Sequence, residues 1–214
     1  MVIYCIIPLK SKRKVKLRLS SVLNLDERIK LTLYMLEDIL EVLQSSKIIK
    51  KLFIVTPDKD FSEFFKGYKN VEVLKEERDE GVNLAVRKAN KVCMEDNAIG
   101  SLVIPSDIPL ISEKELKIIE DFLEGVIISP SLRLDGTNLL LRIPPNSIPT
   151  YYDNNSFYNH LNASLKKKIS TKIFLSRNLC LDIDSIEDVK EFLSIKVDKK
   201  SYHYLSRILG REIV

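Results

Sequence analysis

The chain has 214 residues, of which 45% are apolar and 30% are charged, and its 34 basic and 30 acidic side chains give a formal net charge of +4. This length suits one hydrophobic core, so we expect one domain over residues 1–214, with about the last 20 residues forming a helical extension. The sequence lacks an apolar run of the roughly 20 residues that a membrane span requires, and its start lacks the pattern of a signal peptide. Three separated cysteines without a CxxC pair are typical of buried free thiols, and the protein is expected to be cytoplasmic.

The predicted elements alternate between strands and helices. A continuous apolar run ended by Pro8 suits a strand buried on both faces, and the leucine spacing after the capping pair Asn24 and Glu27 indicates a helix. In chain order, the first elements are strand 2–7, helix 26–44, strand 52–56, a short helix around 61–65, strand 71–74, helix 82–95, strand 101–104 and a helix that begins after Ser112 and carries Leu123. The others are strands 126–128 and 139–143, helix 156–166, strands 172–175 and 179–183, helix 185–193, and a helix around 202–209 that ends at Gly210.

This alternation predicts the fold class. Strands and helices joined by short connections favour an α/β fold with a Rossmann-like open sheet, mostly parallel, and helices on both faces. Ligands bind such sheets at the carboxyl ends of the strands. The longest segment without a periodic pattern runs from Pro8 to about Leu23 and follows the first strand, so it is expected at that edge.

That segment carries the excess positive charge. The first 18 positions hold six basic residues and no acid, whereas the rest of the chain holds 28 basic and 30 acidic residues. A basic surface for duplex nucleic acid is therefore disfavoured, and a nucleic-acid tether would lack interleaved aromatic residues. From its charge alone, the segment is best interpreted as a solvated basic loop. The functional alternative is that its cations bind a polyphosphate. The six are Lys10, Lys12, Arg13, Lys14, Lys16 and Arg18.

Three aspartates are candidates for a Mg²⁺ site. Asp107 directly follows a predicted strand, in a turn stiffened by flanking prolines. Asp182 and Asp184 are two residues apart in a predicted extended segment, so they point to the same side. Mg²⁺ prefers a few carboxylates together with substrate phosphates. Asp107 as a turn residue and Asp184 as a helix cap remain open interpretations.

Uncharged polar residues lie at other strand and helix ends. Thr137 and Asn138 in the DGTN loop offer hydrogen-bond donors. Ser156 begins a helix, where it is either a simple N-cap or part of an anion site. Gly81 and Asn83 open the helix over 82–95, and the Asn83 amide could present a donor and an acceptor to a nucleobase.

The two histidines, His160 and His203, are interpreted as surface or partly buried residues without a catalytic role. Both lie on predicted helices, far from any second ligand. The chain also offers no Ser–His–Asp set, Walker loop or GxGxxG motif.

Taken in order, these segments resemble the 2-phospho-L-lactate guanylyltransferase family (CofC and its relatives), which is similar to molybdenum-cofactor guanylyltransferases and sugar nucleotidyltransferases. The resemblance runs from residue 3 to about residue 193 and rests on IIPLK with KLRLS, DEGVNLAV, IPSDIPLI, DGTNLLLR, the SF of NNSF, and LDIDSIEDV. It implies a Mg²⁺-dependent transfer of GMP from GTP to 2-phospho-L-lactate, giving lactyl-2-diphospho-5′-guanosine and pyrophosphate in coenzyme F-420 biosynthesis. It also suggests a homodimer.

The resemblance implies a role for each matching position. Lys10, Lys16 and Arg18 would hold the GTP phosphates, and Lys16, Arg18 and Asp107 would act in catalysis. Gly81 and Asn83 would face the base, with Pro105 and Ser106 near the ribose or base. Asp107, Asp182 and Asp184 would hold Mg²⁺, and the phosphorylated acid would bind at Thr137, Asn138, Ser156 and the backbone of Asp153.

Leu17, Ser106, Asp135 and Asp153 depart from the family pattern. Asp153 replaces a common glycine and places a negative side chain near the site for the acid. The acceptor therefore stays open between 2-phospho-L-lactate, phosphoenolpyruvate and 3-phosphoglycerate. A sugar phosphate or molybdopterin is disfavoured because PLKSKRKVK stands where those families have a glycine-rich turn, and a non-enzymatic anion- or nucleic-acid-binding module would not need three intact aspartates.

Overall fold

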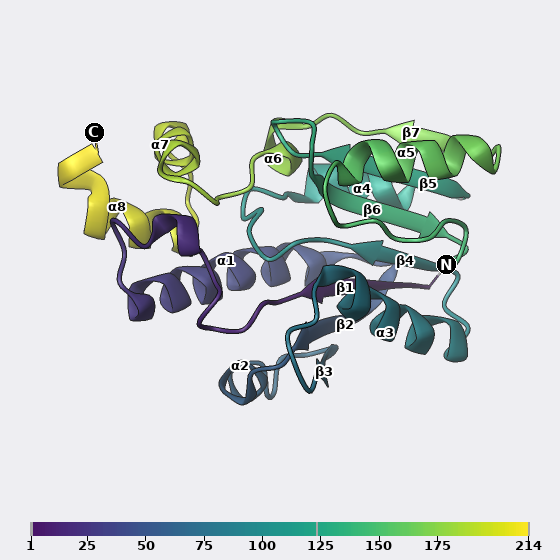
Figure 1. Ribbon diagram of the computed structural model, residues 1–214, viewed down its shortest axis with the longest axis horizontal. Coiled ribbons are helices and arrows are strands. Elements are labelled where there is room, and N and C mark those ends of the chain that lie inside the picture. The colour runs from purple at the N-terminus through teal and green to yellow at the C-terminus, as the bar shows by residue number, and fades with distance from the viewer. Residues whose placement is uncertain (1, 123, 214) are drawn as a thin grey trace.

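The computed structural model describes residues 2–122 and 124–213, which form one seven-stranded sheet covered by helices on both faces (Figure 1). The strand order is β3-β2-β1-β4-β6-β5-β7. Every pairing is parallel except those of β6, which runs antiparallel to β4 and β5. The predicted α/β fold with a mostly parallel sheet is confirmed. The strands are β1 (Ile3–Pro8), β2 (Ile49–Thr56), β3 (Val71–Lys75), β4 (Gly100–Val103), β5 (Gly125–Pro130), β6 (Thr137–Ile143) and β7 (Thr171–Ile173).

Strand β1 shows why the sheet needs helices on both faces. Successive side chains of a strand point to opposite sides. Ile3, Cys5 and Ile7 join the core under α1 (Leu25–Ser45), α2 (Lys59–Phe64) and α4 (Glu113–Glu120). Tyr4 and Ile6 join a second core under α3 (Val82–Glu95) and α5 (Ser156–Lys166). The apolar run of β1 is therefore continuous because both of its faces are buried.

A third apolar cluster lies at the end of the molecule that carries α7 (Ile186–Ile195) and α8 (Lys200–Ile213), drawn in yellow in Figure 1. Helix α8 packs against α1, and α7 packs against α8. The cluster also takes in Leu19, from the short 3-10 helix η1 (Leu17–Leu19), together with Leu181 and Ile183. Two segments with predicted site residues are thus anchored on the same cluster.

The predicted helix starts at Asn24, Ser112 and Ser185 are confirmed. Asn24 with Glu27, Ser112 with Glu115 and Ser185 with Asp188 all form capping boxes, in which each residue of a pair bonds the other's backbone N–H group. The three cysteines are buried free thiols, as predicted. Among the described residues no helix combines the length and the apolar character needed to cross a bilayer.

Three local predictions are wrong or fall elsewhere. The segment predicted as strand 179–183 is the short helix α6 (Arg177–Cys180) followed by extended backbone, because Leu181 N–H bonds back to the Arg177 carbonyl rather than to a neighbouring strand. Helix α8 continues through Gly210 to Ile213. Helix α4 ends at Glu120, and Leu123 lies outside the described residues.

Candidate functional site

A solvent-open cleft lies beyond the carboxyl ends of β1 and β4. Its lining includes apolar side chains of α3 and polar side chains from the loops that follow both strands. Eight of the predicted site residues line the cleft: Lys10, Lys16, Gly81, Pro105, Ser106, Asp107, Thr137 and Asp184. The other six, which are not in its lining, are Arg18, Asn83, Asn138, Asp153, Ser156 and Asp182.

Lys16 is the centre of the charged end of the cleft. Its ammonium donates to Asp107 Oδ2 at 2.6 Å and to Asp184 Oδ1 at 2.8 Å, and its side chain is only 5% exposed. Burial by itself lowers the pKa of Lys16, but the two carboxylates outweigh burial and raise that pKa above its ordinary value. Lys16 is therefore a fixed positive charge inside the site.

The backbone around Lys16 explains its inward direction. Val15 and Leu19 are buried in two different cores on either side of it, and the buried Arg28 guanidinium donates to the Val15 carbonyl at 2.8 Å. Lys16 itself adopts a left-handed conformation, with φ of 48°, at the start of η1. That conformation is unfavourable for a side chain with a Cβ, so the surrounding anchors hold it in place.

Asp182 and Asp184 reach the same site because their neighbours are buried. Leu181 and Ile183 point into the third cluster, so the alternating aspartates point the other way, as the sequence spacing predicts. Ile183 N–H also donates to the Asp107 carbonyl at 3.0 Å, which joins the two aspartate-bearing segments through their backbones.

The three carboxylates differ in their electrostatic surroundings. Burial raises the pKa of Asp182 to about 6, and Asp107 adds to that rise, although the Asn138 amide opposes it. Burial likewise raises the pKa of Asp107. Lys16 lowers the pKa of Asp184, and Lys10 and Arg18 act in the same direction. Arg18, which is exposed on η1, thus contributes positive potential to the site.

These oxygen donors fit a hard divalent cation whose coordination shell is completed by oxygens of a bound ligand. Asp107 Oδ1 is buried and has no hydrogen-bond partner, and the available donors are carboxylate oxygens, which Mg²⁺ prefers. Within residues 2–122 and 124–213, no three acidic, histidine or cysteine side chains form a group that could hold a metal alone. Phosphate oxygens would therefore have to supply further ligands.

Asn83 is committed to a neighbouring loop. Its Oδ1 accepts from Tyr152 N–H at 2.8 Å, and its Nδ2 donates to Asp153 Oδ2 at 2.9 Å. Both ends of the amide that was predicted to face a base are thus engaged with protein. The bond from Asn83 also gives the Asp153 carboxylate, which departs from the family pattern, a hydrogen-bond donor, and neither residue is in the cleft lining.

Gly81 does line the cleft, as the N-cap of α3 with φ of 96°. A residue with a Cβ is strained at this angle. A Cβ built there would meet no atom within 4 Å, so the space over Gly81 is open.

Asn138 turns away from the cleft and holds the segment that carries Asp182. Its Nδ2 lies 3.0 Å from the Leu179 carbonyl and 3.1 Å from Asp182 Oδ1. Its role in the structure is therefore to support a carboxylate, whereas its neighbour Thr137 lines the cleft.

Ser156 and His160 differ from their sequence interpretations. Asn155 is the N-cap of α5, and Ser156 is a buried residue of the first turn whose hydroxyl donates to Thr137 Oγ1 at 3.0 Å. The expectation of a surface or partly buried His160 is wrong, because its ring is fully buried 3.0 Å from the same Thr137 oxygen. Its position four residues after Ser156, on the same helix face, was the available sequence indication.

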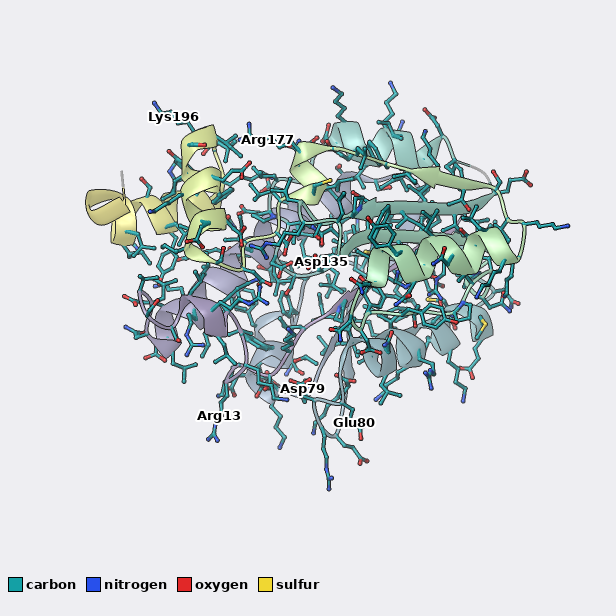
Figure 2. All side chains as sticks on the ribbon, turned by 45° about the horizontal axis from the view of Figure 1, so that its top comes forward. Arg13, Asp79, Glu80, Asp135, Arg177 and Lys196 are labelled. Atoms are coloured by element: carbon teal, nitrogen blue, oxygen red, sulfur yellow. The ribbon has the colours of Figure 1, made fainter. Side chains whose placement is uncertain are left out.

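The basic segment after β1 is only partly solvated. Lys12 pairs with Asp60, and Lys14 lies 3.3 Å from Asp79, while Lys16 is buried with its aspartates. Arg13, in contrast, is exposed and points away from the body of the molecule in Figure 2. The lining residues that sequence reasoning missed include Glu76, Asp79 and Tyr152.

Comparisons with known proteins agree on one family. The family described as "Guanylyl transferase CofC like" matches residues 3–212. The 2-phospho-L-lactate guanylyltransferase of Methanobrevibacter smithii is 31% identical over 208 residues, which cover 96% of this chain and 90% of the relative. The phosphoenolpyruvate guanylyltransferase of Rubrobacter xylanophilus is 31% identical over 192 residues, covering 88% of this chain and 92% of the relative.

The fold has a close structural match as well. A crystal structure of a protein described as a nucleotide-diphospho-sugar transferase, from Desulfovibrio desulfuricans, superposes with a TM-score of 0.77 at 16% identity. The match covers 100% of this chain and 99% of the other. The sheet and its helices therefore have the nucleotide-diphospho-sugar transferase fold.

Proposed function

Because the chain belongs to the family of CofC-like guanylyl transferases, we propose that it transfers the guanylyl group of GTP to the phosphate of 2-phospho-L-lactate. The products would be lactyl-2-diphospho-5′-guanosine and pyrophosphate, for the biosynthesis of coenzyme F-420. One observation carries the proposal: the buried Lys16 ammonium lies between Asp107 and Asp184 at the end of a cleft whose lining also includes Gly81 and Thr137.

The reaction suits a site without a general base. The attacking group is a phosphate oxygen of the acid, which is already an anion. It forms a bond to the α-phosphorus of GTP while the bond from that phosphorus to the bridging oxygen of pyrophosphate breaks. The barrier lies in bringing negative groups together in line, so positioning and fixed positive charge are the main contributions.

Lys16, Lys10 and Arg18 supply that positive charge. Lys16 is buried and pre-positioned, whereas Lys10 lies exposed in the cleft lining and Arg18 is exposed on η1. We assign the triphosphate to this end of the cleft because a polyanion there would meet all three cations. Asp107, Asp182 and Asp184 would hold Mg²⁺, which supplies charge neutralisation of the phosphates when bound.

The guanine base is assigned to the end of the cleft near Gly81. Val82, Ala85 and Val103 give this part an apolar lining, and Glu76 contributes a half-buried carboxylate. Guanine presents N–H donors on its pairing edge, which a carboxylate accepts. Because the Asn83 amide is engaged elsewhere, Glu76 takes the place of Asn83 as the proposed acceptor for the base.

The acid is assigned to Thr137, supported by Ser156 and by the 152–153 loop that Asn83 holds. Phosphoenolpyruvate is the second candidate acceptor, because the Rubrobacter xylanophilus relative carries that name at 31% identity. The two acids differ little in size and charge, so a donor site such as Thr137 accommodates either.

A product assay tests the proposal. The purified protein is incubated with GTP, Mg²⁺ and 2-phospho-L-lactate, phosphoenolpyruvate or 3-phosphoglycerate, and pyrophosphate and the guanylylated acid are measured. We expect product with 2-phospho-L-lactate at the highest kcat/KM. Faster turnover of another acid would move the assignment to that acid, and the absence of product with all three would overturn the proposed function.

A further inference from the structure

A buried hydrogen-bonded group lies directly behind Thr137, and the assignments above give its histidine no role. It consists of His160 on α5, Ser156 at the start of the same helix, and the backbone of Tyr151. His160, Ser156 and Thr137 are all buried, and only Thr137 of the three lines the cleft.

The directions of these hydrogen bonds follow from the Tyr151 backbone. Its N–H group lies 2.8 Å from His160 Nε2 and can only donate, so Nε2 is the acceptor and carries no proton. Burial, with a smaller effect of Arg142, lowers the pKa of His160 to about 3, which keeps the ring neutral. A neutral ring without a proton on Nε2 has one on Nδ1, and Nδ1 therefore donates to Thr137 Oγ1 at 3.0 Å.

Ser156 donates to the same oxygen. Its Oγ lies 3.0 Å from Thr137 Oγ1 and 3.5 Å from the Asp135 carbonyl, and the longer distance exceeds the usual range for a bond between oxygens. Thr137 Oγ1 thus accepts two hydrogen bonds, which occupy both lone pairs of a hydroxyl. Its own proton has no acceptor left within this group and is available to the cleft.

We propose that His160 is a positioning residue that fixes the Thr137 hydroxyl as a hydrogen-bond donor to an anionic oxygen of the phosphorylated acid. The inference rests on the proposed function, since it takes the acid to bind at Thr137. A hydroxyl in water both donates and accepts, whereas this one is restricted to donating. It therefore favours a phosphate or carboxylate oxygen in the cleft and disfavours groups that donate.

Two substitutions of His160 separate positioning from packing. In His160→Asn the amide nitrogen takes the place of Nδ1 and keeps a donor toward Thr137, and in His160→Phe a ring remains without any donor. We expect His160→Phe to raise KM for the acid about tenfold or more, with KM for GTP changed less than about threefold. His160→Asn should recover most of this loss. Equal increases in both KM values, or no recovery with Asn, would overturn the inference.

A double substitution tests whether His160 acts through Thr137. Thr137→Val removes the hydroxyl at nearly constant volume. If His160 works by orienting that hydroxyl, adding His160→Phe to Thr137→Val leaves KM for the acid unchanged. A further tenfold rise in the double variant would instead mean that His160 acts independently, and would also overturn the inference.

The tautomer is measurable without any substrate. The chain has only two histidines, so long-range ¹H–¹⁵N spectra of the wild-type protein resolve both rings. We expect a protonated Nδ1 and an unprotonated Nε2 in His160 throughout the range from about pH 5 to 8. A proton on Nε2 would overturn the inference even in an active enzyme. Absence of product in the wild-type assay would instead overturn the proposed function, and the spectrum would still decide the hydrogen-bond direction.

Discussion

The Lys16 ammonium donates hydrogen bonds to two carboxylates, those of Asp107 and Asp184, and compensates the charge of both. Removing one partner of a buried ionic group leaves an uncompensated charge. Asp107 and Asp184 would then repel each other across the cleft, at the place where we assign a triphosphate. The same ammonium therefore stabilises the ligand-free site and would attract an anionic ligand to it.

We expect Lys16→Met to reduce kcat/KM for GTP about 100-fold or more, because a fixed positive charge at the phosphates is lost. The matched control is Arg13→Met, which removes a cation from the same segment that is exposed and points away from the body (Figure 2). Steady-state kinetics with varied GTP measures both. Equal losses of kcat/KM in the two variants would mean that the basic segment acts through its overall charge and not through Lys16 in particular.

Asp107 and Asp184 are the next residues to test. Asp107→Asn and Asp184→Asn keep the side-chain volume and remove a carboxylate charge, so we expect each to reduce turnover about 100-fold or more and to raise the Mg²⁺ concentration for half-maximal rate. Asp198→Asn is the control, because Asp198 is fully exposed and its ion pair with His203 lies outside the cleft lining. Near-normal rates in either site variant would remove that residue from the metal assignment.

His160 also makes stability depend on pH. Its pKa is lowered to about 3 by burial, against 6.5 in an unfolded chain, so the unfolded state binds a proton first as the pH falls. This contribution to stability is complete above about pH 6.5 and is lost as the pH falls toward 3. Between about pH 6 and 4, urea unfolding should therefore show wild type losing about 1.4 kcal/mol more per pH unit than His160→Asn. Parallel pH curves for the two proteins would contradict this.

At the scale of elements, helix α3 begins at a cleft-lining position where the backbone conformation requires glycine. Gly81 has positive φ and faces open space, so it allows the helix to begin beside a bound ligand. The chain offers a matched residue in Gly67, which also has positive φ and open surroundings but is not in the cleft lining.

Alanine at either glycine should lower the free energy of unfolding by about 1–2 kcal/mol, because both backbone conformations strain a Cβ. Only Gly81→Ala should also raise KM for GTP, since its new methyl group occupies space over the cleft. Thermal unfolding and kinetics of the two variants measure this. A KM for GTP that rises equally in both would attribute the effect to general destabilisation.

At the scale of the whole molecule, the charge distribution favours a small anion over a polymer. Part of the basic segment is paired with Asp60, Asp79 and the site aspartates, and the remainder of the chain is slightly acidic. Affinity for duplex DNA needs many cations on one surface.

We therefore expect a Kd for duplex DNA weaker than about 100 μM at physiological salt, from fluorescence anisotropy of a labelled duplex. The triphosphate GTP, titrated in the same buffer with Mg²⁺, should bind more tightly than the duplex. Tighter binding of the duplex, with a steep salt dependence, would contradict the assignment of the segment to a small anion.

Much of the fold could be predicted because its determinants are local. The apolar run at Ile3–Pro8, the capping box at Asn24 and the spacing along α3 and α5 each depend on a few neighbouring residues. The incorrect prediction of a strand at 179–183 shows the limit of local patterns. A short apolar run suits a strand or a buried helical turn equally, and the hydrogen-bond partners of its backbone determine which one forms.

The sequence by itself determined which segments meet, since parallel strands have their carboxyl ends at one edge of the sheet, where the residues after β1 and β4 lie. It also determined that Asp182 and Asp184 share a side. Only the tertiary structure decided how those residues pair: Lys16 with aspartates 91 and 168 positions away, Asn83 with Asp153, and Thr137 with His160. The physical reason is that a hydrogen bond depends on distance and direction in space, and residues so far apart in the chain are placed relative to one another only by the packed core between them.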